Sequence, residues 1–327
     1  MKYVGFDAPG DPSVLRLFDA PAPLPVAGEI QIAVEAAGVS RADALGRRGL
    51  YPAPPGHSSI LGLEVAGSVA ALGPGVERWR IGDRVCALCN GGGYAERVVV
   101  PEGSALPLPE NWSAVEGATL PENAFTAYDN LVNRAAMEPG DTLLIHGGTS
   151  GLGTMAIGIA RALGARVFVT AGSHRKCAKA IQLGAHRAID YRTTDFVAST
   201  LAYTNGRGVD IILDLVGGDY VARDLEALAT EGRVVVLSTM RGSEVQLDLT
   251  ALLRKRARVI GSSLRGRSNA EKAQIAEDLQ QAIWPLLSAR RPIAPVVDSV
   301  FPFAQAQKAH ERLESSEHIG KIVLIPV

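Results

Sequence analysis

A glycine-rich segment near the middle of the chain constrains the fold more than any other feature. An uncharged, mostly apolar run over residues 142–146 leads into a cluster of glycines, and a stretch typical of a helix follows over residues 154–163. A strand that enters a helix through such a turn presents unpaired backbone N–H groups and the positive end of a helix dipole to a ligand. The lack of side chains at Gly148, Gly151 and Gly153 lets a pyrophosphate approach the backbone. The segment therefore predicts a dinucleotide site, although the glycine spacing differs from the usual Gly-x-Gly-x-x-Gly.

The order of the expected elements divides the 327-residue chain into two parts. From about residue 140, apolar runs alternate with helical stretches, which is typical of a parallel sheet covered by helices on both faces. Before about residue 120, short strands are separated by turns rich in Gly and Pro, as in a β-barrel-like domain. The sequence predicts an α/β fold in which residues 1–122 and 268–327 form the barrel domain. Residues 123–267 are expected to form a doubly wound parallel sheet of the Rossmann type.

The residues after the second expected strand, 165–170, decide which dinucleotide we expect. A site for NAD places an acidic residue about 20 positions beyond the glycines, where it holds the ribose 2′-hydroxyl. This region carries no carboxylate and instead carries Ser173, Arg175 and Lys176. Cations are unfavourable in the first turn of a helix, and a bound 2′-phosphate gives them a reason to be there. We therefore expect NADPH rather than NADH.

Charge and cysteine content exclude several classes of function. The chain has 33 Lys and Arg against 34 Asp and Glu, a formal net charge of −1, so neither nucleic acid nor a membrane is expected as a partner. Three cysteines and an N-terminus without the apolar core of a signal peptide indicate a cytoplasmic protein. Cys86 and Cys89 have the spacing of metal ligands but lack a second pair, and we expect no metal.

These features together resemble the medium-chain dehydrogenase/reductase superfamily, in which a GroES-like barrel domain accompanies a Rossmann domain. Its zinc alcohol dehydrogenases carry Cys at the position of Ser40 and Gly-His-Glu where this chain has Gly62-Leu63-Glu64, so the resemblance implies that both catalytic zinc ligands are missing. The sequence is more similar to the zinc-independent quinone oxidoreductases related to zeta-crystallin, and among them to the tumour-suppressor-inducible subgroup. The matching segments are residues 41–43, 49–56, 60–64, 121–122, 126–128, 150–153, 170–173, 213–214, 217–218 and 319–324.

The resemblance implies a set of residues that contact NADPH. They are Ser150, Gly151 and Leu152 at the pyrophosphate, Gly172, Ser173, Lys176 and Tyr191 at the adenosine ribose and its 2′-phosphate, and Ser238, Thr239, Met240, Ser263, Leu264 and Arg265 around the nicotinamide and its ribose. The glycine pattern adds Gly148 and Gly153 to the first group, and the positive charge after the second strand adds Arg175 to the second. The last group is expected in loops at the carboxyl ends of parallel strands, where ligands of such sheets bind.

The resemblance also implies the reaction, a hydride transfer from NADPH to a quinone-type small molecule in the cleft between the domains, without a metal. Quinones are good electrophiles, so orientation and exclusion of water can supply most of the catalysis. Tyr51 is expected to line the acceptor pocket through its ring or through a hydrogen bond to the developing oxyanion, although such a ring equally serves packing alone. Ser40 and Arg41 are expected to add polar contacts, and Thr126 is expected near the nicotinamide. Ser40 departs from the Asn that is usual in the family.

Two alternatives to quinone reduction remain open. The same scaffold hosts reductases of activated C=C bonds in enones or enoyl thioesters. An NADPH-binding sensor or structural protein with little turnover would share the cofactor site. The resemblance implies a homodimer. The last strand of the parallel sheet, expected within residues 256–263, also exposes an edge that can pair with its twin.

Overall fold

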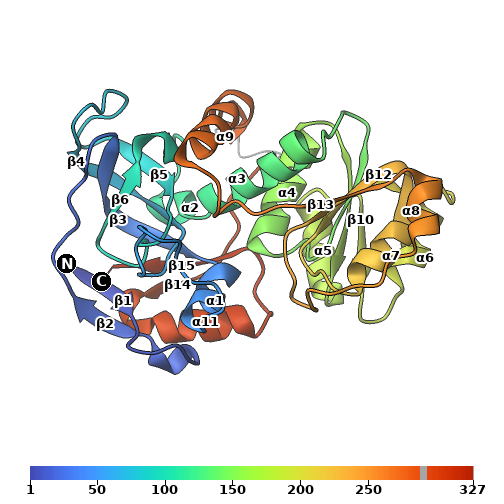
Figure 1. Cartoon of the computed structure of the whole chain (residues 1–327), viewed down its shortest axis with the longest axis horizontal. Coiled ribbons are helices and arrows are strands. Elements are labelled where there is room, and N and C mark those ends of the chain that lie inside the picture. Colours follow the sequence, from blue (N-terminus) through green and yellow to red (C-terminus); the bar gives the residue numbers. More distant parts are fainter. Residues whose placement is uncertain (288–292, 327) are drawn as a thin grey trace. The chain divides into compact units, whose positions relative to one another are not determined.

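Residues 1–287 and 293–326 are described by the computed structural model, in which the chain forms two units, each built around one large β-sheet (Figure 1). In the first unit, β1 (Lys2–Gly5) and β2 (Arg16–Asp19) form a further two-stranded sheet. The first unit comprises Met1–Phe125, Arg265–Ser288 and Pro295–Val327, and the second comprises Thr126–Leu264 and Ala289–Ala294. The chain thus changes unit after Phe125 and after Leu264, close to the boundaries at residues 122 and 267 that the sequence suggests.

One part of the predicted division was wrong. The tail from residue 268 onward was expected to lie wholly in the barrel domain, but Ile293 and Ala294 belong to the second unit. The physical reason is apolar packing, because Ile293 is only 1% exposed and its side chain packs against Gly158 in the second unit. A side chain at residue 158 would occupy the space that Ile293 fills.

The first unit is built on a seven-stranded sheet in the order β14-β15-β3-β4-β5-β7, with β6 paired to β3. One side of β3 pairs with β4, whereas the other side pairs first with β6 and then with β15, which curves the sheet toward a barrel. Ile30, Ile32 and Val34 alternate along β3 and form the core with residues such as Val65 and Val85. The strands are β1 (Lys2–Gly5), β2 (Arg16–Asp19), β3 (Glu29–Val39), β4 (Glu64–Leu72), β5 (Arg84–Leu88), β6 (Arg97–Pro101), β7 (Ala105–Pro107), β14 (Val297–Pro302) and β15 (Lys321–Ile325), and the helices are α1 (Arg41–Arg47), α2 (Ala114–Gly117), α9 (Asn269–Ala282), α10 (Trp284–Leu287) and α11 (Ala306–Glu314).

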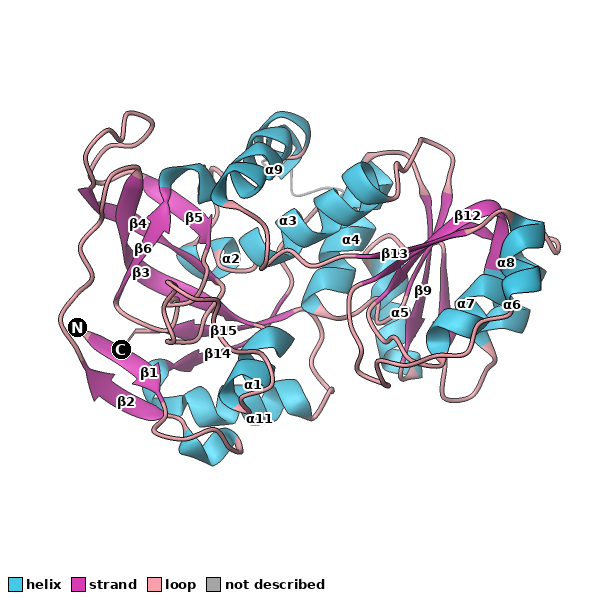
Figure 2. Ribbon diagram, in the orientation of Figure 1, coloured by secondary structure: helices cyan, strands magenta, loops and turns pink. Residues whose placement is uncertain are grey.

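The second unit is a six-stranded parallel sheet in the order β10-β9-β8-β11-β12-β13. Counted from β8, this is the 3-2-1-4-5-6 order of a doubly wound dinucleotide-binding sheet. Figure 2 shows α4 on one face of the sheet and α7 and α8 on the other, so the predicted fold class is confirmed. The strands are β8 (Thr142–Ile145), β9 (Arg166–Ala171), β10 (Arg187–Asp190), β11 (Val209–Asp214), β12 (Leu228–Val236) and β13 (Arg258–Gly261), and the helices are α4 (Gly151–Ala162), α5 (His174–Gln182), α6 (Phe196–Tyr203), α7 (Tyr220–Ala227) and α8 (Leu249–Lys255), with α3 (Pro121–Tyr128) containing the division after Phe125.

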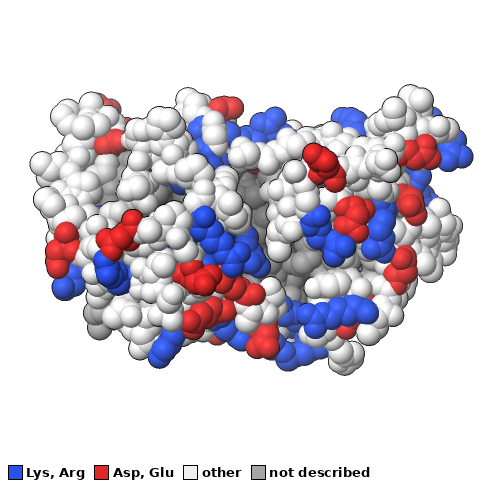
Figure 3. Space-filling model, turned by 60° about the horizontal axis from the view of Figure 1, so that its bottom comes forward, with Lys and Arg blue, Asp and Glu red and all other residues white. Residues whose placement is uncertain are grey.

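The surface carries charges of both signs. Figure 3 shows acidic and basic side chains intermixed over one face, as expected for a formal net charge of −1. None of the helices in the described part of the chain is both long enough and apolar enough to cross a membrane.

Candidate active site

The glycine-rich turn, where the sequence predicts the pyrophosphate, lies between β8 and α4. Ser150 caps α4, and its Oγ accepts a hydrogen bond from the Gly153 amide at 3.0 Å. Gly147 has a φ of +69°, in the left-handed region that favours glycine. A Cβ at residue 153 would lie 2.4 Å from the Gly147 carbonyl oxygen, and one at residue 148 would lie 2.4 Å from the Val169 side chain. Glycine is therefore required here by one backbone conformation and by two close approaches.

The residues expected at the adenosine end follow β9 and β10. Ser173 caps α5, and its Oγ accepts a hydrogen bond from the Lys176 amide at 3.3 Å. The first turn of α5 thus places Arg175 and Lys176 together with the N-terminal end of its dipole. Gly172 lies against the Tyr191 ring, since a Cβ at residue 172 would lie 2.7 Å from the Tyr191 hydroxyl oxygen. The Tyr191 ring therefore packs against Gly172, directly before the first turn of α5, which carries Arg175 and Lys176.

The remaining expected cofactor loops lie at the same edge of the sheet. Residues 238–240 follow β12 and residues 263–264 follow β13, both at carboxyl ends of parallel strands. Gly217, in the loop after β11, packs against the backbone of Ser238. The Asp214 carboxylate fixes that loop by accepting a hydrogen bond from the Gly217 amide at 3.0 Å. Sequence reasoning gave Asp214 and Gly217 no role, although both lie in segments that match the family.

Thr126 belongs to the second unit and lies buried in α3. It is 9% exposed, and its carbonyl oxygen accepts a hydrogen bond from the Asn130 side-chain amide at 2.7 Å. Whether it lies near the nicotinamide stays a prediction.

Tyr51 lies beside Arg265 in the first unit. The Arg265 guanidinium carbon lies 4.6 Å from the centre of the Tyr51 ring, a cation–π arrangement, and Nη1 donates a hydrogen bond to the Tyr51 carbonyl oxygen at 3.1 Å. Both residues line a cavity of about 190 Å³ whose other walls include Phe6, Ile60 and Leu61. The structure thus places Arg265, which was expected at the nicotinamide ribose, in direct contact with the residue expected to bind the acceptor.

Arg265 is itself held by a buried lysine. Lys272, on α9, is 2% exposed and donates hydrogen bonds to the Arg265 carbonyl oxygen at 3.2 Å and to the Asn90 side chain at 2.6 Å. Burial lowers the pKa of Lys272. Lys272 and Asn90 are part of the support of Tyr51, and no sequence motif marked either of them.

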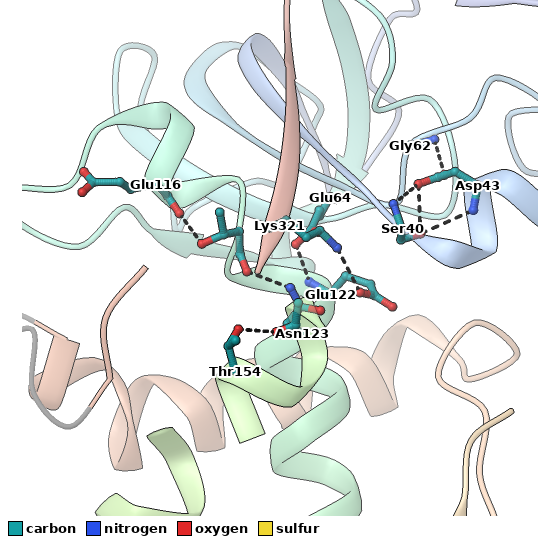
Figure 4. A network of polar contacts seen from close by, with 11 residues as sticks. Ser40, Asp43, Gly62, Glu64, Glu116, Glu122, Asn123, Thr154 and Lys321 are labelled. Carbon is teal, nitrogen blue, oxygen red and sulfur yellow. Dashed lines mark hydrogen bonds and ion pairs between the residues drawn. The ribbon is translucent and has the colours of Figure 1, made fainter. Parts of the chain in front are cut away.

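Ser40 has a structural task that the sequence analysis missed (Figure 4). It is 6% exposed and is the N-cap of α1, where its Oγ donates a hydrogen bond to Asp43 at 2.9 Å while Asp43 accepts another from the Ser40 amide at 2.8 Å. The second Asp43 oxygen accepts a hydrogen bond from the Gly62 amide at 2.8 Å, and burial raises the pKa of this carboxyl. Since Asn and Ser are both good N-caps, the exchange of the family's usual Asn for Ser40 preserves this role. Arg41 follows in the first turn of α1 and is half-buried.

A buried ion pair lies where zinc alcohol dehydrogenases carry Gly-His-Glu (Figure 4). Lys321, on β15, lies 2.5 Å from Glu64 on β4 and 3.4 Å from Glu122. The other Glu64 oxygen accepts a hydrogen bond from the Glu122 amide at 3.0 Å. Burial, opposed in part by Lys321, raises the pKa of Glu64 to about 7, and the two carboxylates outweigh the effect of burial and raise the pKa of Lys321. The pair therefore ties two strands to the start of α3.

The cysteines are not part of a metal site in the described ranges. Cys86 and Cys89 are buried, and burial raises the pKa of both thiols. Within residues 1–287 and 293–326, no three His, Cys, Asp or Glu side chains are grouped so as to hold a metal ion.

Comparison with known proteins gives matches over both units. The family model of the alcohol dehydrogenase GroES-like domain matches residues 26–110, and that of zinc-binding dehydrogenases matches residues 151–281. The structure of Escherichia coli quinone oxidoreductase complexed with NADPH is 30% identical in sequence, with a TM-score of 0.84 and complete coverage of both chains. The chain belongs to the medium-chain dehydrogenase/reductase superfamily, in the family of the quinone oxidoreductases. This family membership confirms the predicted family and makes the protein an oxidoreductase, while the tumour-suppressor-inducible subgroup stays a prediction.

Other relatives of this medium-chain dehydrogenase/reductase have names that indicate other substrates. The structure of CurK enoyl reductase is 27% identical, with a TM-score of 0.87, and the match covers 100% of this chain and 99% of that one. The phthioceranic/hydroxyphthioceranic acid synthase of Mycobacterium tuberculosis is 37% identical over 210 residues, which are 64% of this chain. The match spans only 10% of that synthase, so the chain corresponds to a small part of the curated relatives that it matches.

Proposed function

We propose that this oxidoreductase transfers a hydride from NADPH to a quinone-type acceptor. The observation that carries the choice of NADPH is the first turn of α5, where Ser173 caps the helix and Arg175 and Lys176 follow in place of an acidic residue. A relative that covers the whole chain was determined with NADPH, which supports the same choice. A relative named quinone oxidoreductase at 30% identity over the full length supports the acceptor class.

The residues present fit NADPH at both of its charged ends. The turn at Gly147, Gly148 and Gly153 is a cradle that side chains would fill, and the N-terminus of α4 adds donors for a pyrophosphate. Lys176, Arg175 and the Tyr191 ring suit the 2′-phosphate and its ribose. When bound, NADPH supplies the hydride, and the protein has to hold and orient both reactants.

On the acceptor side, Tyr51 orients the reacting molecule. Arg265 contacts both the carbonyl oxygen and the ring of Tyr51, so the phenol is held before an acceptor arrives. The Tyr51 hydroxyl can donate a hydrogen bond to the oxygen on which negative charge develops, and its ring can stack on a flat acceptor. The Arg265 charge beside it favours the same developing charge. Proton delivery to the product is left to solvent.

Substitution of Tyr51 tests this assignment. We expect Tyr51→Ala to lower kcat/KM for quinone reduction by about 10- to 100-fold, since both stacking and a hydrogen bond are lost. Tyr51→Phe retains the ring and should lose about 10-fold or less, the effect of one hydrogen bond. Tyr203→Phe, which alters a tyrosine that is 42% exposed on α6, serves as the matched control and should leave steady-state quinone turnover unchanged. Wild-type turnover in both Tyr51 variants would remove Tyr51 from the mechanism.

An acceptor panel tests the function as a whole. NADPH oxidation is measured with an ortho-quinone, a para-quinone, an enone and a primary alcohol as partner, and NADH is compared with NADPH. Quinone-dependent oxidation with a preference for NADPH supports the proposal. A preference for the enone favours reduction of activated C=C bonds instead, the alternative that the likeness to CurK enoyl reductase and to the mycobacterial synthase supports. Tight NADPH binding without turnover favours a sensor or structural protein.

The protein is further proposed to be a homodimer in the cytoplasm. β13 is the edge strand of the second unit's sheet, and Val259 on it is 40% exposed. Leu249 and Leu253 on the nearby α8 are 64% and 75% exposed, which is unusual for leucine side chains. Light scattering should give twice the mass of one chain, and Val259→Lys should shift the population toward the monomer. A wild-type protein that is monomeric at micromolar concentration contradicts this assignment.

A further inference from the structure

A chain of buried polar side chains lies directly behind the glycine-rich turn of the second unit. His146, between β8 and the turn, Thr170 on β9 and Asp224 on α7 are all at most 1% exposed. The His146 Nε2 lies 2.7 Å from an Asp224 carboxylate oxygen, and its Nδ1 lies 3.1 Å from the Thr170 hydroxyl. That hydroxyl in turn accepts a hydrogen bond from the Gly147 amide at 3.3 Å. This series of hydrogen bonds therefore connects α7, on one face of the sheet, to Gly147, the first glycine of the turn.

The direction of these hydrogen bonds follows from the groups at the two ends. A carboxylate can only accept, so the His146 Nε2 carries a proton and donates it to Asp224. When Nδ1 carries no proton it accepts from the Thr170 hydroxyl, whose oxygen accepts from the Gly147 amide. In this arrangement every donor of the cluster has one acceptor, whereas the second Asp224 carboxylate oxygen has no hydrogen-bond partner among the described residues.

Packing holds the imidazole in this orientation. The rings of Phe196 and Tyr220 meet the His146 ring edge-on, with centroids 4.7 and 4.9 Å away, and stack on each other at 5.3 Å. The Arg223 guanidinium lies over the Phe196 ring at 4.3 Å. Burying a carboxylate and an imidazole is costly unless the geometry is well satisfied, so an apolar core would fill this space more simply. The presence of this polar cluster in the core points to a task other than packing.

We propose that His146, Thr170 and Asp224 are positioning residues that set the conformation of the dinucleotide turn. They hold the Gly147 amide, and Thr170 also holds the next residue, since its carbonyl oxygen accepts a hydrogen bond from the Gly148 amide at 2.9 Å. The turn is thereby kept in the shape that receives a pyrophosphate before the dinucleotide binds. The inference rests on the proposed function only in that the wild-type protein binds NADPH.

Thr170 offers the cleanest test, because valine has the same shape without the hydroxyl. Thr170→Val should weaken NADPH binding, measured by NADPH fluorescence on the unloaded protein, by about 10-fold, the effect of one hydrogen bond. Thr170→Ser retains the hydroxyl and should stay within about twofold of the wild type. The kcat at saturating NADPH should be unchanged in both variants, because the acceptor side is untouched.

The matched control is Thr200→Val in α6. Thr200 is also a fully buried threonine of the second unit, but its hydroxyl has no hydrogen-bond partner among the described residues. Its replacement should leave NADPH affinity at the wild-type value. Equal NADPH affinity in wild type and Thr170→Val overturns the positioning role, whereas a wild type that binds no NADPH contradicts the proposed function instead.

A second measurement needs no cofactor. Nitrogen-15 NMR of the unloaded protein should find a proton on the His146 Nε2, assigned by comparison with His146→Gln. A ring that carries its only proton on Nδ1 overturns the hydrogen bond to the Asp224 carboxylate, and with it this arrangement, even if the Thr170 variants fold poorly.

Discussion

Gly153→Ala is expected to weaken NADPH binding by at least about 100-fold, a loss of roughly 2.7 kcal/mol. The added Cβ would lie 2.4 Å from the Gly147 carbonyl oxygen and 2.7 Å from the Gly148 Cα, and both are backbone atoms that no side-chain rotation can move. Either the turn or the first turn of α4 has to shift, and the N–H groups that face the pyrophosphate shift with it. Titration of NADPH fluorescence measures the loss directly.

The control for this variant is Gly261→Ala at the end of β13. A Cβ at residue 261 meets nothing within 4 Å, and Gly261 is not among the residues with positive φ. NADPH affinity should therefore be unchanged, and circular dichroism should be native-like in both variants. An affinity for Gly153→Ala equal to that of the wild type would mean that the turn does not receive the dinucleotide.

Local patterns explain why the fold could be predicted from the sequence. The expected strands over residues 142–146 and 165–170 agree with β8 and β9 to within one residue at each end, because apolar runs bounded by charged or turn residues define a buried strand well. The glycine turn was recognisable for the same reason, since strand, turn and helix are contiguous in sequence. The edge position predicted for the strand within residues 256–263 is confirmed by β13.

The capping role of Ser40 was also within reach of sequence reasoning. Ser40 is followed three residues later by Asp43, a spacing that signals a helix N-terminus. The resemblance to enzymes with a zinc ligand at this position instead suggested a direct role in the acceptor site. The hydrogen bonds of the Ser40 hydroxyl with Asp43 show that it caps α1.

Contacts between distant residues could not be predicted in this way. Arg265 and Tyr51 are 214 positions apart, and His146 and Asp224 are 78 apart, so no periodicity or motif links them. Such pairs depend on how the elements pack, and a single sequence contains no signal for them. The contacts that hold Tyr51 and the polar side chains behind the turn are therefore visible only in the structure.

Lys321→Met is expected to cost about 3–5 kcal/mol of folding free energy, because it leaves the Glu64 carboxylate buried without its counter-charge. Lys321 is 4% exposed and Glu64 is fully buried, so solvent cannot take the place of the missing ammonium group. Urea denaturation monitored by circular dichroism measures the change. The matched control is Lys2→Met, which removes an exposed ion pair in which Lys2 and Asp19 lie 3.7 Å apart. This change should affect stability little.

The pH dependence separates an unpaired charge from simple loss of packing. Burial already raises the pKa of Glu64 from its ordinary value of 4.5 to about 7, and removal of Lys321 raises this pKa further. A carboxyl whose folded pKa exceeds its unfolded pKa stabilises the folded state fully below pH 4.5, and that contribution is lost as the pH rises through the folded pKa. Lys321→Met should thus be less destabilised at pH 5.5 than at pH 8.5, and the further change Glu64→Gln should abolish most of this difference. A defect that is equally large at both pH values would instead indicate that the lysine side chain contributes by packing, which does not depend on the charge of Glu64.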